Sequence, residues 1–304
     1  MIRRPPRSTL SSSSAASDVY KRQGLGNMGL PMAENLQKEG HEVTGFDINK
    51  NINSNIRISN SIEEIVKSNK AIFTMLPSGK EVIAVYNEII DKCDSSTIMI
   101  DCSTIDIKST DVIANISKKN GLLTLDAPVS GGVVGAVDGT LTFMVGGDER
   151  AFNKIKPLFE VMGKKAVYCG VSGSGQAAKM CNNMILGISM IGVCESFTLA
   201  KKIGLDLKKL YEVSSNSSGS CWALNTYCPA PEIGPETPAD KNYLPGFSSE
   251  LMLKDLMLAQ DAAIQSNSHT PLGNHAMKIY EELLNEGGKG KDFSYVFPFF
   301  YNKK

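Results

Sequence analysis

The sequence predicts an α/β domain, built on a doubly wound and mostly parallel sheet, followed by an all-α domain. Two observations lead to this prediction. Between residues 24 and 170, short apolar runs alternate with helical patterns, which is typical of parallel strands joined by helices. A proline-free, apolar run from Ser174 to Lys202 then predicts one long helix, and no convincing strand follows it.

The composition is that of a globular chain with room for two domains. Of the 304 residues, 32 are basic and 32 acidic, so we expect no nucleic-acid partner. The longest uncharged apolar stretch, 184–194, is shorter than the about 20 residues of a membrane span, so we expect no membrane association. Seven dispersed cysteines indicate a reducing compartment without a disulfide framework, and three histidines lack metal-ligand spacing, so no metal is predicted.

Residues 1–23 differ from the rest of the chain. They are basic and serine-rich, with Asp18 as their one acidic residue. We predict either a leader with the composition of a transit peptide or a segment that is not native. Because the residues before Gly24 do not resemble a buried strand, we expect the sheet to lack its first, central strand.

A glycine-rich turn over 24–29 precedes a helix expected over 30–39. Gly24 permits a tight turn, Gly26 lets a pyrophosphate approach the backbone, and Gly29 allows close helix packing. An apolar run over 42–46 follows and ends in an acid. This order is the fingerprint of a dinucleotide-binding Rossmann fold.

The acid is Asp47, at about the 20-residue spacing of that fingerprint. It is expected to accept hydrogen bonds from ribose hydroxyls and to repel a 2′-phosphate, which favours NAD over NADP. The alternative is an ordinary glycine-rich turn beside a surface aspartate.

Further strands are expected over 71–76, 97–100, 122–125, 141–145 and 166–169, with a helix over 148–162. Ligands of parallel sheets bind at the carboxyl ends of the strands. At one such end, Ser130 and the two glycines after it offer a hydroxyl and backbone N–H groups that can hold a carboxylate. The alternative is a loop selected for turn geometry alone.

The long helix carries polar residues on an apolar element. We expect Ser174 as its N-cap and an end before Gly204. Lys179 and Asn183 are four residues apart, so they share one face. Burying polar groups without partners is costly, which indicates a site. The alternative is that Lys179 is solvated and has no role.

Three more helices are expected, over 206–217, 249–266 and 270–285. The proline-rich stretch 218–247 between them is long enough to predict a functional loop such as a lid. Lys254 lies near the start of the second of these helices and is either functional or a solvated helix lysine.

Segments of this chain resemble, in order and spacing, those of the β-hydroxyacid dehydrogenase family, and 217–229 and 291–297 are most similar to the 3-hydroxyisobutyrate dehydrogenases. The resemblance covers Gly24 to about Phe297. Two departures are Cys102, where the family often has serine, and Glu81, where a neutral side chain is expected. The segments are GLGNMGLPMA (24–33), FD (46–47), MLP (75–77), DCSTI (101–105), DAPVSGG (126–132), GTLTFMVGG (139–147), GSGQAAKMCNN (173–183) and LMLKDLMLAQD (251–261).

The resemblance implies a Rossmann domain over 24–170 and a helical substrate and oligomerisation domain over 171–304, joined by the long helix with the active site at the cleft. It implies that Lys179 is the catalytic base. The substrate-binding residues would be Ser130, Gly131, Gly132, Asn183, Trp222 and Tyr227, although the two aromatic residues are equally consistent with core packing. The cofactor-binding residues would be Gly24, Leu25, Gly26, Asn27, Met28, Gly29, Asp47, Leu76, Pro77, Glu81, Thr104 and Lys254.

The resemblance further implies NAD-dependent oxidation of 3-hydroxyisobutyrate to methylmalonate semialdehyde, a step of valine catabolism. It implies a small hydroxyacid substrate, a homo-oligomer (dimer or tetramer), and a mitochondrial matrix location in a eukaryote or a cytoplasmic one otherwise. One alternative is a related enzyme for tartronate, glyoxylate or succinic semialdehyde or for serine. Another is a catalytically silent NAD-binding module, which the presence of Lys179 disfavours.

Overall fold

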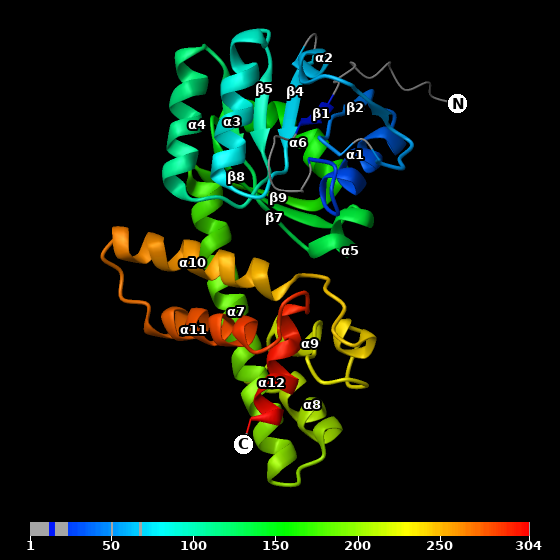
Figure 1. Ribbon diagram of the computed structural model, residues 1–304, viewed down its shortest axis with the longest axis vertical. Coiled ribbons are helices and arrows are strands. Elements are labelled where there is room, and N and C mark those ends of the chain that lie inside the picture. The colour runs from blue at the N-terminus through cyan, green and yellow to red at the C-terminus, as the bar shows by residue number, and fades with distance from the viewer. Residues whose placement is uncertain (1–11, 16–23, 50, 67–68, 304) are drawn as a thin grey trace. The chain divides into compact units, whose positions relative to one another are not determined.

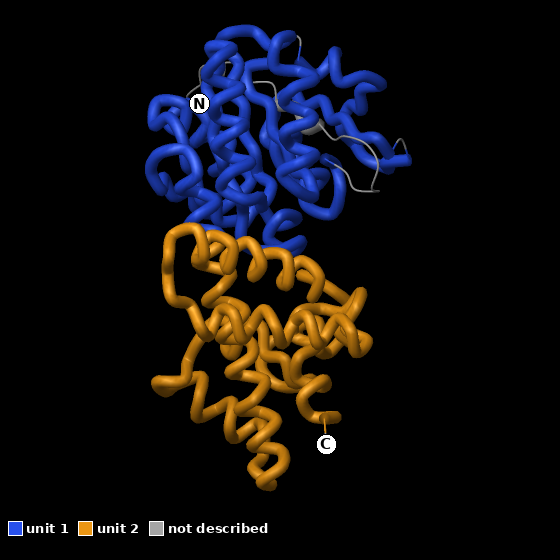
Figure 2. Tube along the Cα trace, turned by 60° about the vertical axis from the view of Figure 1, so that its left-hand side comes forward, with its two compact units in different colours: residues 1–179 blue, residues 180–304 orange. Residues whose placement is uncertain are grey.

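The computed structural model describes residues 12–15, 24–49, 51–66 and 69–303 (Figure 1). The chain divides into two compact units, unit 1 over residues 1–179 and unit 2 over residues 180–304 (Figure 2). In the described chain every strand belongs to unit 1, whereas unit 2 is helical apart from an isolated bridge between Ser248 and Asp292. The predicted fold class is therefore confirmed.

Unit 1 is built on a nine-stranded sheet. Its strands are β1 (Ser12–Ala15), β2 (Val43–Gly45), β3 (Arg57–Ile58), β4 (Ala71–Thr74), β5 (Ile98–Asp101), β6 (Leu123–Asp126), β7 (Val129–Ser130), β8 (Leu141–Gly147) and β9 (Gly163–Gly170). The order is β3-β2-β1-β4-β5-β6-β8-β7, with β9 also paired to β8. Neighbours from β3 to β6 are parallel, while β8 is antiparallel to β6 and β7. This is the doubly wound order, in which the sheet grows outward from its centre.

Helices cover both faces of this sheet. They are α1 (Gly29–Lys38), α2 (Ile62–Val66), α3 (Gly79–Ile89), η1 (Ile90–Lys92), α4 (Ile107–Lys119), α5 (Gly132–Val137) and α6 (Glu149–Met162). On β4, Ala71 and Phe73 join a core with α1 and α6, whereas Ile72 between them joins a core with α2, α3 and α4. Strands buried on both faces have continuous apolar sequences, which is why β4 and β5 could be predicted.

The central position of the sheet is occupied, so the expectation of a missing first strand was wrong. β1 pairs in parallel with β2 on one side and with β4 on the other. The expectation relied on apolar side chains, whereas a ladder is made by backbone N–H and C=O groups, which serine and alanine also supply. Residues 1–11 and 16–23 lie outside the described residues, and the origin of segment 1–23 stays a prediction.

Unit 2 packs its helices around an aliphatic and aromatic core that includes Phe197, Leu256, Tyr280 and Phe293. The helices of this part of the chain are α7 (Ser174–Lys202), α8 (Leu207–Ser215), α9 (Trp222–Asn225), η2 (Pro238–Lys241), α10 (Ser249–Gln265), α11 (Pro271–Asn285), η3 (Phe293–Tyr295) and α12 (Val296–Asn302). The four helices expected in this part of the chain are present as α7, α8, α10 and α11, with ends that differ from the expected ones by at most a few residues.

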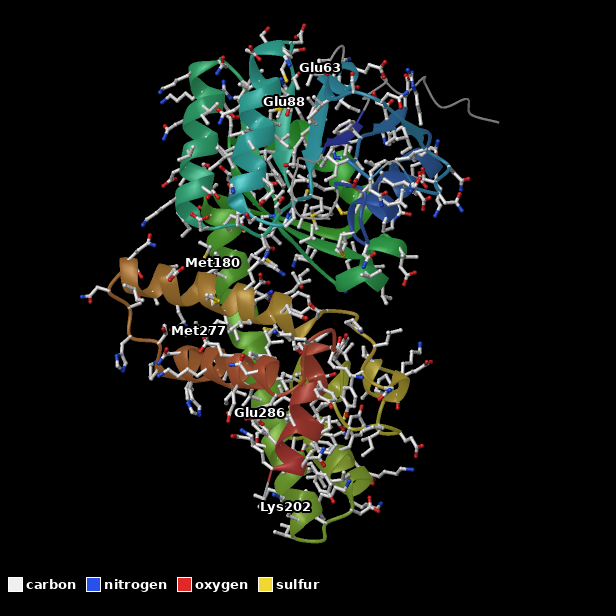
Figure 3. The ribbon with its side chains drawn as sticks, viewed as in Figure 1. Glu63, Glu88, Met180, Lys202, Met277 and Glu286 are labelled. Atoms are coloured by element: carbon white, nitrogen blue, oxygen red, sulfur yellow. The ribbon has the colours of Figure 1, made fainter. Side chains whose placement is uncertain are left out.

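Helix α7 begins in unit 1 and continues into unit 2, where Met180 and Lys202 are labelled in Figure 3. It ends as expected before Gly204, whose φ of 84° suits glycine, and the Leu205 amide donates to the Ala200 carbonyl. By length and composition alone α7 could cross a membrane, although half of its most apolar window is buried within the protein. Core helices have the same composition.

The stretch 218–247 contributes Leu224, Cys228 and Ile233 to the core of unit 2, and its role as a functional loop such as a lid stays a prediction. The Thr237 hydroxyl donates to the Cys228 carbonyl at 3.0 Å, and the Tyr243 hydroxyl donates to the Pro229 carbonyl at 2.8 Å. Thr237 and Asp240 also form a capping box that fixes η2. Three of the prolines, Pro231, Pro235 and Pro245, are exposed, whereas Pro229 is buried.

Candidate active site

The glycine turn before α1 has no space for a side chain at its third glycine. A Cβ at Gly29 would lie 1.8 Å from the Gly24 carbonyl oxygen and 3.6 Å from the Met75 Cβ. The turn therefore folds back on itself and packs on the end of β4. The start of α1 leaves backbone N–H groups available for an anion, as in phosphate-binding turns.

Asp47 connects the end of β2 to this turn. Its carboxylate accepts hydrogen bonds from the Leu25 amide at 2.9 Å and from the Asn49 amide at 2.7 Å. Burial raises the pKa of Asp47, and the two backbone hydrogen bonds oppose this effect. The alternative of a surface aspartate is wrong, because Asp47 is buried beside the glycine turn.

A second group of predicted residues lies on the loops after β4 and β5. The Leu76 amide donates to the Ser103 hydroxyl oxygen at 2.8 Å, and that hydroxyl donates to Asp101 at 2.6 Å. The Thr74 hydroxyl donates to the same oxygen of Asp101 at 2.7 Å. Asp101 thus joins the two loops that carry Leu76, Pro77 and Thr104. Glu81 lies nearby in sequence, in the first turn of α3, and accepts a hydrogen bond from the Ser78 hydroxyl.

The start of α7 is held by an acid that the sequence reasoning missed. Asp126, at the end of β6, accepts hydrogen bonds from the Gly173 amide at 2.8 Å and the Gln176 amide at 3.0 Å. Ser174 is already the first helical residue, so its prediction as N-cap was wrong, because Asp126 satisfies these amides from outside the helix. Burial raises the pKa of Asp126 to about 6.

Lys179 follows in the second turn of α7. Only 7 % of its surface is exposed, so the alternative of a solvated lysine is wrong. A lysine is rarely buried unless its ammonium group is paired or its charge is lost. This burial is what sets Lys179 apart from the other lysines of the described chain.

Ser130 lies at the end of β7, where it pairs with Thr142 of β8. The two residues after it have φ angles of 133° and 62°, which favour glycine. The backbone conformation of the turn therefore explains why residues 131 and 132 are glycines. It does not explain why residue 130 is a serine. The loop presents this hydroxyl beside two residues without side chains.

In unit 2, Asn183 is buried, with 2 % of its surface exposed. Its side-chain amide donates to Asp255 of α10 and accepts from Asn182 at 2.9 Å. The sequence reasoning missed Asp255, although its neighbour Lys254 was singled out. The Lys254 ammonium lies 3.8 Å from the other Asp255 oxygen. The available signal was an acid in the stretch 251–259, which is apolar apart from Lys254 and Asp255.

Trp222 and Tyr227, also in unit 2, stack with ring centroids 5.0 Å apart. The Tyr227 hydroxyl donates to buried Asp292 at 3.0 Å, and its ring packs 5.3 Å from Phe293. Tyr227 is therefore partly buried and packs against the core of unit 2, whereas Trp222 is 49 % exposed. Across the described residues no three His, Cys, Asp or Glu side chains gather as metal ligands, and all seven cysteines are free.

Two known protein families match this chain, one over its first part and one over its second part. The family described as the NAD binding domain of 6-phosphogluconate dehydrogenase matches residues 23–187. The family described as "NAD-binding of NADP-dependent 3-hydroxyisobutyrate dehydrogenase" matches residues 173–300.

Individual relatives agree with these matches. The mitochondrial 3-hydroxyisobutyrate dehydrogenase of Drosophila melanogaster is 46 % identical over 92 % of this chain and 89 % of its own. A probable 3-hydroxyisobutyrate dehydrogenase of Mycobacterium bovis is 43 % identical over 90 % of this chain and 94 % of its own. The solved Mycobacterium tuberculosis 3-hydroxyisobutyrate dehydrogenase with L-serine has a TM-score of 0.88 at 39 % identity, covering 96 % of this chain and 99 % of that one. The chain therefore belongs to the 3-hydroxyisobutyrate dehydrogenase family of oxidoreductases.

Proposed function

We propose that this chain oxidises 3-hydroxyisobutyrate to methylmalonate semialdehyde with NAD, as in valine catabolism. The single observation that carries the proposal beyond its relatives' names is the buried lysine, Lys179, on a helix bonded to the ends of β5 and β6. We also propose a homo-oligomer, and a mitochondrial location if the source is eukaryotic, since relatives from animals and Dictyostelium discoideum are named mitochondrial.

The residues of unit 1 fit a dinucleotide. The turn over 24–29 admits no side chain at Gly29, so its backbone can approach a pyrophosphate. Asp47 places a carboxylate beside that turn, where it can accept from the ribose hydroxyls and disfavour a 2′-phosphate. Leu76, Pro77, Glu81, Thr104 and Lys254 complete the proposed cofactor contacts. When bound, NAD accepts a hydride from the carbinol carbon of the substrate.

In this proposal Lys179 accepts the proton of the substrate hydroxyl as the C–H bond breaks and the carbonyl forms, and returns it in the reverse reaction. Burial disfavours the charged form of an amine, which suits a base. The Ser130 hydroxyl and the amides of Gly131 and Gly132 donate to the substrate carboxylate. Asn183 binds the substrate as well, and Trp222 and Tyr227 shape the pocket around its small apolar end.

A steady-state screen by NADH absorbance tests this function. It compares 3-hydroxyisobutyrate, serine, glycerate and 4-hydroxybutyrate, each with NAD and with NADP. We expect the highest kcat/KM for 3-hydroxyisobutyrate with NAD. A higher value for another acid would assign the chain to a sister activity. NADH binding without any turnover would instead support the silent NAD-binding module.

A further inference from the structure

Gln176 is fully buried, and both the nitrogen and the oxygen of its side-chain amide are hydrogen-bonded. The amide nitrogen donates to the Ser103 carbonyl at 2.7 Å, and the amide oxygen accepts from the Ile105 amide at 3.2 Å. These two partners flank Thr104, a proposed cofactor contact. Gln176 also lies three residues before Lys179, so the two side chains are neighbours on α7.

The backbone around Gln176 is held equally tightly. A Cβ at Gly175 would lie 2.3 Å from the Met144 carbonyl oxygen and 2.6 Å from that of Asp126. A Cβ at Gly146 would lie 2.8 Å from the Gly175 amide. With the Asp126 carboxylate on the Gln176 amide, these contacts fix the first turn of α7 against the ends of β6 and β8.

The Gln176 side chain therefore joins two parts of the site. On one side is the turn of α7 that leads to Lys179, already anchored to the sheet. On the other is the loop 103–105, which continues through the Ser103 hydroxyl to the Leu76 amide. Gln176 therefore links helix α7 to this loop through two hydrogen bonds.

We propose that Gln176 is a positioning residue that locks the cofactor loop 103–105 to the turn of α7 carrying Lys179. The inference rests on the proposed function, in which Lys179 exchanges the proton. Without the two amide hydrogen bonds the loop and the base no longer share one geometry. A displacement of about 1 Å in such a geometry can lower the rate about 100-fold.

The test is Gln176→Met, which keeps the length of the side chain and removes both hydrogen bonds. We expect kcat to fall about 10- to 100-fold, while KM for the hydroxyacid and Kd for NADH change less than about threefold. The deuterium isotope effect on kcat, with substrate deuterated at the carbinol carbon, should rise because hydride transfer becomes more rate-limiting. Counting kcat per NADH-binding site removes the effect of unfolded protein.

A matched control is Gln260→Met in unit 2, where another buried glutamine accepts from the Thr270 hydroxyl at 3.0 Å. Gln260→Met should lower the melting temperature, because it also removes a buried hydrogen bond. It should leave kcat and the isotope effect unchanged. If Gln176→Met does not fold, Gln176→Asn, one methylene shorter, should still raise the isotope effect.

Two outcomes are distinguishable. An unmodified chain that turns over no hydroxyacid contradicts the proposed function, and with it the positioning role of Gln176. An active unmodified chain together with a Gln176→Met variant that has a lower melting temperature but an unchanged kcat and isotope effect overturns the role of Gln176 alone.

Discussion

Asp47 and Asp126 are both buried acids at strand ends, yet their surroundings give them different roles. Asp47 accepts from the glycine turn and the following loop, so its carboxylate lies where a ribose is expected. Asp126 accepts hydrogen bonds from two backbone amides at the start of α7 and thereby holds the first turn of that helix. Residue type and position in a strand do not separate these roles, whereas the hydrogen-bond partners do.

The charge of Asp47 is the proposed source of NAD preference. Asp47→Asn keeps the size of the side chain and removes the repulsion toward a 2′-phosphate. We expect the ratio of kcat/KM for NAD to that for NADP to fall at least about tenfold, or about 1.4 kcal/mol. Steady-state assays with both cofactors measure this ratio, and an unchanged ratio would contradict the assignment.

Lys179→Ala should remove the proposed base without disturbing cofactor binding. General-base catalysis contributes about 100- to 10,000-fold, so kcat should fall by at least about 100-fold while Kd for NADH stays within about threefold. Lys201→Ala is the control, because Lys201 is on the same helix but is exposed and lies over the Tyr301 ring. Retained turnover in Lys179→Ala would exclude this residue as the base.

Local patterns at the residue scale could be predicted, whereas long-range pairs could not. The glycine turn and Asp47 are set by spacing within about 20 residues. Asn183 and Asp255 are separated by 72 positions, and Gln176 by 71 from Ile105. Sequence spacing alone contains no information on which side chains meet across such separations.

At the scale of elements, the glycines of α7 show how one helix meets different environments. Gly175 is pressed against the backbone of β6 and β8, and a Cβ at Gly187 would lie 3.1 Å from a Leu256 methyl carbon. Gly192 has nothing within 4 Å of its Cβ position. Helical propensity is the same at each position, so packing decides the effect of a substitution.

Gly175→Ala and Gly192→Ala should therefore have opposite effects. The first forces a Cβ onto carbonyl oxygens and should destabilise unit 1 by several kcal/mol, since a backbone shift is required. The second should stabilise the helix by up to about 1 kcal/mol. Thermal unfolding of both variants measures the difference, and equal melting temperatures would contradict the packing of α7 described above.

The elements also show which strands the sequence can reveal. β4 and β5 are buried on both faces and are continuous apolar runs, so their prediction was reliable. β3 and β7 are two residues long and leave no periodic pattern. β1 was missed for a different reason, because its place in the sheet is set by backbone pairing to β2 and β4.

Considered as a whole, the molecule buries acids that resist ionisation. Burial raises the pKa of Asp47, Asp126 and Asp292. Backbone and side-chain hydrogen bonds lower the pKa of Glu63, labelled on the surface in Figure 3, and of Asp94, but both groups are solvent-screened. Folding therefore favours the protonated forms of the three buried acids.

The contribution of Asp126 to the free energy of unfolding should accordingly fall as pH rises from about 4 to above 6. For Asp126 the pKa rises from 3.8 in the unfolded chain to about 6, so its stabilising contribution is full below 3.8 and is lost as pH passes 6. The loss is about 3 kcal/mol. Asp126→Asn, which cannot ionise, should show a shallower dependence of the urea midpoint on pH between 4.5 and 7.5. Parallel slopes in the two proteins would contradict this linkage.

Trp222 is the only tryptophan in the chain. Because it is half exposed and stacked on Tyr227, its indole emission reports from one defined place in unit 2. Any hydroxyacid that displaces water from the indole, or alters the stacking, changes the colour and intensity of that emission without an added dye. The protein thus contains its own optical probe at a proposed substrate contact, and binding can be followed separately from turnover.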